Sequence, residues 1–183
     1  MKKLIWGKTL FESYKYIKRL VNSLDRIIYE KSVNSYGMSI DGKNTIESME
    51  AVIDLIQRKK RLLLIKMIVE EGLKNIDRHD AKILIRYYLD KIELKTIADQ
   101  EGKTTRTMSR LVDKMILSFM DKMSDLGYSY VKIEKMLENE GWIVGVFNSH
   151  IRKNASGSTK VEPLIVPASS KFDKLLYAYC VSK

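Results

Sequence analysis

The fold is decided by residues 94–115, which read LKTIADQEGKTTRTMSRLVDKM. A short helix from Leu94 would carry Ile97 and Ala98, and Gly102 follows four residues after Ala98. Where a tight turn joins two crossing helices, a small residue is needed at their contact and a glycine where φ becomes positive. Ala98 and Gly102 meet these two requirements, so the stretch predicts a helix-turn-helix.

The second helix of this unit is predicted to begin at Thr104 or Thr105, because threonine is a favourable N-cap. Helical spacing gives it an apolar face made of Met108, Leu111, Val112 and Met115. In helix-turn-helix proteins the first turns of the second helix face base edges, and arginine can pair bidentately with guanine. We therefore expect Arg106 and Arg110, which share one face, to read bases. The expected DNA-binding set is completed by the phosphate contacts Lys103, Thr104 and Lys114 and by Thr105 and Ser109.

A supporting helix is predicted directly upstream, from Asp77 to Leu89. Asp77 is a candidate N-cap, and Asp80 follows three residues later in the first turn. The apolar side chains of this segment fall on one helical stripe, made of Ile83, Leu84, Tyr87 and Tyr88. We expect this helix to pack against the helix-turn-helix, in a unit that spans residues 77–123.

The unit resembles region 4 of sigma factors and the phage regulators built on that module. The resemblance rests on Ala81–Leu89, on Leu94-x-x-Ile97-Ala98, and on Gly102-x-Thr104-x-x-Thr107-Met108-x-x-Leu111. It implies binding in the major groove upstream of promoters, with a face available to RNA polymerase. The chain departs from the family pattern at Glu101 and Lys103, where apolar residues are usual, and nothing upstream resembles the promoter-melting region 2.

A helical hairpin is predicted for residues 1–76. Apolar residues alternate four and three apart from Leu10 to Ile28, and again from Ile46 to Met67, which is the spacing of a coiled-coil seam. The first seam consists of Leu10, Tyr14, Ile17, Val21, Leu24 and Ile28; the second consists of Ile46, Met49, Ile53, Ile56, Leu63 and Met67, with Lys60 as its polar member. Turn-forming residues break the pattern at 32–44, and Gly72 is expected to end the second helix. The two helices could fold back on each other or form a homodimer through residues 8–71.

A weaker helix-turn-helix pattern follows in residues 124–153. Ile133, Met136 and Leu137 form an apolar stripe, and Glu140-Gly141 supplies a turn, so that residues 127–153 resemble the helix-turn-helix of recombinase-type proteins. Trp142–Phe147 could instead form a β-strand, as part of a small β-wing. The candidate residues for a second DNA contact are Asn148, Ser149, His150 and Arg152. Beyond them, residues 154–183 are predicted to be a linker followed by a short C-terminal segment at 160–183.

The composition favours a polyanionic partner. Lys and Arg number 33 against 23 Asp and Glu, which gives a net charge of +10 and a pI near 9.5. The apolar runs are too short for a signal peptide or a membrane span, so we expect a bacterial cytoplasmic, nucleoid-associated protein without membrane contact. With a single Cys180 and only His79 and His150, no metal site, cofactor or catalytic triad is expected, and we expect no enzymatic activity.

The sequence therefore predicts a mainly all-α fold, with a long helical hairpin followed by a helix-turn-helix bundle. The expected function is sequence-specific binding of double-stranded DNA by a transcription regulator. Two alternatives stay open. One is a structural DNA adaptor, such as the small subunit of a phage packaging terminase, and the other is a module that binds RNA polymerase.

Overall fold

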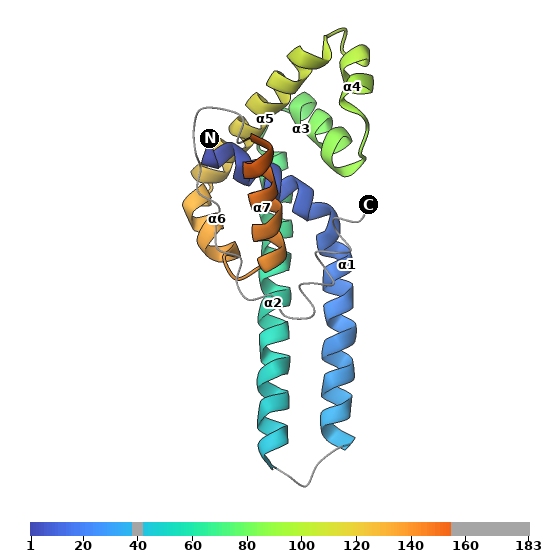
Figure 1. The fold of residues 1–183 in the computed structure, drawn as a ribbon, viewed down its shortest axis with the longest axis vertical. Helices are drawn as coiled ribbons and strands as arrows, with labels where there is room; N and C mark the ends of the chain where they lie inside the picture. Colours follow the sequence, from blue (N-terminus) through green and yellow to red (C-terminus); the bar gives the residue numbers. More distant parts are fainter. Residues whose placement is uncertain (38–41, 155–183) are drawn as a thin grey trace. The chain divides into compact units, whose positions relative to one another are not determined.

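The computed structural model describes residues 1–37 and 42–154, and this part of the chain is helical and contains no strand. The helices are α1 (Lys2–Gly37), α2 (Gly42–Lys74), α3 (Arg78–Leu84), α4 (Leu94–Gln100), α5 (Thr105–Asp125), α6 (Tyr130–Leu137) and α7 (Gly141–Asn154), and a π-helical turn, η1 (Ile85–Leu89), continues α3 (Figure 1). The predicted all-α fold is confirmed. The linker and the C-terminal segment expected at 154–183 lie outside the described residues, apart from Asn154.

The chain divides into two compact units, each described here by itself. The hairpin unit consists of Tyr16–Met67. The body consists of Met1–Lys15 and the described residues from Ile68 onward. The sequence suggested a boundary at residue 76, whereas the division falls within α1 and α2. The reason is that the N-terminal part of α1 and the C-terminal part of α2 belong to the body.

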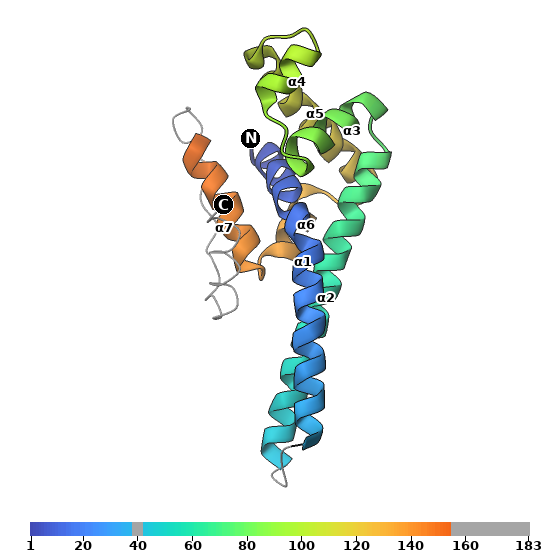
Figure 2. The same ribbon diagram turned by 90° about the vertical axis from the view of Figure 1, so that its right-hand side faces the viewer.

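In the hairpin unit, α1 and α2 lie side by side and run antiparallel (Figure 1, Figure 2). The predicted stripe of α1 is the packed face, since Ile17, Val21 and Leu24 are buried. On α2 the buried side chains of this unit are Leu62 and Ile65, and not the expected seam residues. An ion pair between Lys59 and Asp25 also joins the two helices.

The body is built around α5. Its apolar face is buried along the whole helix and consists of Met108, Val112, Met115, Ile116, Phe119, Met120 and Met123. Two glycines let neighbouring helices approach this face with their backbones. A Cβ atom at Gly7 of α1 would overlap the side chain of Ile116, and one at Gly72 of α2 would overlap the ring of Phe119.

Aromatic rings from α1 continue this core. The Phe11 ring centroid lies 4.7 Å from that of Phe119 and 5.3 Å from that of Tyr88. Trp6 stacks on Phe147 of α7 at 4.4 Å. Such ring pairs are worth about 0.5–1.5 kcal/mol beyond the area that they bury. The first turns of α1 therefore hold η1, α5 and α7 together.

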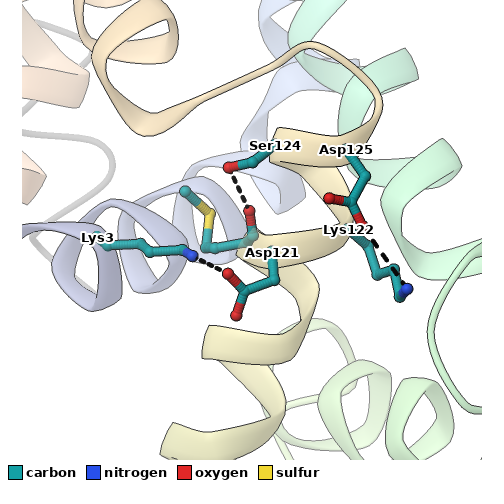
Figure 3. Close-up of polar contacts among 6 residues, drawn as sticks. Lys3, Asp121, Lys122, Ser124 and Asp125 are labelled. Carbon is teal, nitrogen blue, oxygen red and sulfur yellow. Dashed lines mark hydrogen bonds and ion pairs between the residues drawn. The ribbon is translucent and has the colours of Figure 1, made fainter.

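Polar contacts surround this core. Lys3 of α1 pairs with Asp121 of α5 (Figure 3). Within α5, Lys122 and Asp125 pair at 3.7 Å, and the Ser124 hydroxyl donates to a backbone oxygen one turn earlier. Lys2 lies 2.8 Å from a carboxylate oxygen of Glu134 on α6. The Lys3 and Lys2 pairs join α1 to α5 and α6, although partly exposed pairs such as these contribute little to stability.

One tyrosine joins the two long helices inside the body. The Tyr14 hydroxyl donates to the Glu70 carboxylate at 2.7 Å. Burial, together with this hydrogen bond, raises the pKa of Tyr14 to about 12. The phenol therefore stays a neutral donor at physiological pH.

Two expectations about helix bounds are wrong, and one alternative is excluded. Gly72 does not end the second helix, because α2 continues to Lys74 and uses this glycine for its contact with α5. The interruption expected at 32–44 is much shorter, since α1 reaches Gly37 and α2 begins at Gly42. The β-strand suggested for 142–147 is absent. This segment belongs to helix α7, in which Ile143 and Phe147, one turn apart, are both buried.

The contact at Gly72 can be tested by Gly72→Ala. Alanine favours a helix over glycine by about 1 kcal/mol, whereas overpacking a core costs about 1–3 kcal/mol. Phe119 and Met123, which the new methyl group would meet, are fully buried and cannot swing aside. The new methyl group would overlap both of these side chains, which places the overpacking cost in the upper part of its range. We therefore expect a net loss of about 1–2 kcal/mol in the free energy of unfolding, measured by urea denaturation. The neighbouring exposed-site variant Glu71→Ala serves as the control, and equal stability of the two variants would contradict the contact.

Candidate nucleic-acid interface

The first helix of the predicted unit begins where the sequence indicated. The Asp77 carboxylate caps α3 by accepting from the backbone N–H groups of His79 (2.8 Å) and Asp80 (3.3 Å). The chain then widens into the π-helical turn η1, in which the Asp90 N–H bonds to the Ile85 carbonyl at 3.1 Å. Both α3 and α4 contact α5. The three helices thus form one packed unit within the body.

The turn between α4 and α5 has the features predicted for it. Ile97 and Ala98 are fully buried, and Gly102 has a φ of +61°. The Lys103 N–H closes the turn on the Ala98 carbonyl at 2.9 Å. No atom lies within 4 Å of a Cβ built at Gly102. The glycine is therefore required by the backbone conformation and not by a lack of space.

The two positions that depart from the sigma pattern have different surroundings. Lys103 is exposed. Glu101 is half-buried, and its carboxylate lies 3.2 Å from Nε2 of His79 at the start of α3. A second polar contact joins Arg86 of η1 to Gln100 of α4. Polar contacts with α3 and η1 thus lie beside the turn, where sigma region 4 usually has apolar residues. Nothing in the sequence spacing pointed to His79 in this role.

The helix α5 begins at Thr105, with Thr104 as its N-cap. The backbone of Thr104 is extended, and its hydroxyl accepts from the Thr107 N–H at 3.2 Å. Met108, Val112 and Met115 are buried as predicted, and Leu111 is half-buried. The cap and the buried stripe together determine which side chains α5 leaves in solvent.

All the residues expected to contact DNA in this unit are exposed. They are Lys103, Thr104, Thr105, Arg106, Ser109, Arg110 and Lys114, and we call them the α5 basic face. Arg106, Arg110 and Lys114 follow one another at intervals of four residues and therefore line one side of the helix. The N-terminal end of a helix also carries a partial positive charge.

One acidic residue lies in this part of α5, and it is neutralised from α1. Between residues 102 and 114, Asp113 is the only acidic side chain, against four basic ones. Its carboxylate lies 2.7 Å from the Lys8 ammonium group. The pair reduces the repulsion that Asp113 would exert on a phosphate group near Lys114. Lys8 is a contributor that the sequence pattern did not reveal.

The four residues of the second candidate DNA contact do not lie together on the surface. Residues 127–153 do form two helices joined by a short turn, and the Ser129 hydroxyl caps α6. However, Asn148 and His150 are only 7% exposed, and Nε2 of His150 lies 3.2 Å from a Glu12 carboxylate oxygen. Ser149 is half-buried and donates to the Val146 carbonyl. Of the four candidates, Arg152 alone is exposed.

Residues 1–37 and 42–154 carry neither of two other kinds of feature. No cluster of three or more His, Cys, Asp or Glu side chains there is arranged to hold a metal ion. Within the same residues, no helix combines the length and the apolar character that a membrane span requires. Of the two sets of predicted DNA contacts, the α5 basic face alone is exposed in all its members.

The chain matches no protein-family model, and no curated protein or solved structure is significantly similar to it.

The turn can be tested by Gly102→Ala. A side chain at positive φ costs about 1–2 kcal/mol, and the open space around this position means that no steric overlap adds to that cost. We expect Gly102→Ala to lower the free energy of unfolding by about 1 kcal/mol and Gly102→Asn to lower it less, because asparagine tolerates this conformation. Chemical denaturation monitored by circular dichroism measures both. An alanine variant as stable as the wild type would contradict the positive φ.

Proposed function

We propose that the chain is a sequence-specific double-stranded DNA-binding regulator of transcription, which inserts the first turns of α5 into the major groove. The observation that carries this proposal is the α5 basic face, which is exposed at the start of the second helix of a helix-turn-helix unit. The sequence resemblance to sigma region 4 supports the same reading. It also suggests a bacterial or phage regulator that acts close to RNA polymerase.

The side chains divide into base readers and phosphate contacts. Arg106 and Arg110 have the planar donor pair that matches the O6 and N7 acceptors of guanine. Lys103 and Thr104 precede or cap the helix, and Lys114 lies two turns after Arg106. A helix inserted by its N-terminal end places such flanking residues beside the phosphates. The partial positive charge of the helix terminus adds to this attraction.

The packing of the rest of the unit supports a rigid α5 basic face. Ala98 and Met108 are fully buried beside the turn, and the His79 contact with Glu101 ties the turn to α3. Farther along α5, Gly7 and Gly72 lock the helix against α1 and α2. Recognition benefits from such anchoring, because side chains on a well-packed helix lose less conformational freedom when they bind.

The proposal is tested by selecting bound duplexes from a random pool and measuring the affinity of variants for the selected sequence. We expect Arg106→Ala to weaken specific binding by about 5- to 150-fold, which corresponds to about 1–3 kcal/mol, and to relax the preference at one base pair. Lys122→Ala is the matched control, since it removes the same charge from the exposed last turns of α5.

Two outcomes would contradict this function. Equal effects of Arg106→Ala and Lys122→Ala would show that binding depends on overall charge and not on the α5 basic face. Failure to enrich any sequence from the pool, at salt concentrations that suppress non-specific binding, would exclude sequence-specific recognition.

A further inference from the structure

A second apolar stripe lies on α2, on a face that the hairpin does not use. Its members are Ile46, Met49, Ile53, Ile56, Leu63 and Met67, which are 36 to 61% exposed, together with the exposed Lys60. We call these seven residues the outer stripe. They follow one another at alternating intervals of three and four, which is the a/d spacing of a coiled coil over three heptads.

The outer stripe is distinct from the face that α2 buries within the hairpin unit. The buried side chains there are Leu62 and Ile65, and Leu55, two turns before Leu62, is half-buried. A single helical partner covers only one such face of a helix. A continuous row of large exposed apolar side chains usually marks a surface that binds another protein.

The charges on this part of α2 are divided into two blocks. Residues 46–56 contain Glu47, Glu50 and Asp54 and no basic residue, whereas residues 57–67 contain five Lys or Arg and no acidic residue. If two copies of α2 paired in parallel, each block would lie beside a block of the same sign. In an antiparallel pair each acidic block meets a basic one, so the helix is complementary to itself in that direction.

One antiparallel register also matches the apolar side chains. It places Ile46 of one copy opposite Leu63 of the other, and Ile53 opposite Ile56. In the layer between them, Lys60 lies opposite Met49 of the second copy and next to its Glu50. The Lys60 stem can then pack on Met49 while its ammonium group reaches the Glu50 carboxylate. A single lysine at a seam position is a known means of fixing register and oligomer state.

We propose that the outer stripe of α2 is the docking surface for a second copy of this chain, paired antiparallel through residues 46–63. The pairing buries the exposed aliphatic side chains of both copies and joins their opposite charge blocks. This proposal does not depend on DNA binding, and the two are tested by different measurements.

The mass of the full-length protein in solution, measured by sedimentation equilibrium at micromolar concentrations, tests the surface. We expect a dimer for the wild type and a monomer for Ile53→Glu. The control is Tyr29→Glu, which introduces the same charge at a 71% exposed apolar side chain elsewhere in the hairpin unit and should leave the dimer intact. Circular dichroism shows whether each variant is folded. A monomeric wild type, or a dimer that Ile53→Glu leaves unchanged, would overturn the proposal.

A charge exchange tests the direction of pairing. In the antiparallel register Lys60→Glu brings two carboxylates together, and we expect it to raise the dimer dissociation constant by at least about tenfold. The double variant Glu50→Lys with Lys60→Glu restores the pair with its signs exchanged and should recover most of the affinity. In a parallel pair Lys60 would face its own copy, so the single variant would not weaken the dimer and the second substitution would rescue nothing. That result would overturn the antiparallel pairing.

Discussion

The close approach of three helices at Gly7 and Gly72 is the constraint on which the body depends. Because neither position carries a side chain, the backbones of α1 and α2 reach the apolar face of α5 at Ile116 and Phe119. Phe11 then fills the space between Phe119 and Tyr88 and thereby couples η1 to the same core. The later half of α5 is held on several sides. Its first turns have α3 and α4 packed beside them.

This anchoring links the core to the electrostatics of the α5 basic face. The α1 turns that pack on α5 also carry Lys3 and Lys8, which pair with Asp121 and Asp113. Two of the three acidic side chains of α5 are in this way neutralised by a neighbouring helix, while the basic residues of its first turns stay in solvent. A protein that binds a polyanion through one end of a helix gains from such a distribution, since the field near the contact stays positive.

The sequence could predict what depends on local rules. Asp77, Thr104 and Gly102 act within a few residues of their own position, as two caps and a turn, and each lies where the pattern placed it. Contacts between distant segments were out of reach. Gly72 has the position of a helix C-terminal glycine, yet it lies inside α2 and against Phe119, a residue 47 positions later in the chain. Polar residues such as Asn148 and His150 suggested a surface, but they lie buried in the body. The sequence shows the heptad spacing of the outer stripe of α2. Spacing alone could not tell that the adjacent face, with Leu62 and Ile65, would be the buried one.

In the proposed function, the first turns of α5 lie against DNA. Site-specific photocrosslinking tests it most directly, with p-benzoylphenylalanine placed at Ser109, on the α5 basic face, or at Ser118, an exposed serine farther along the same helix. The nine residues that separate them place the two positions on opposite sides of the helix. With a duplex selected by the protein itself, we expect a crosslink from position 109 and none from position 118. A crosslink from position 118 alone, or from neither position while the duplex is bound, would contradict it.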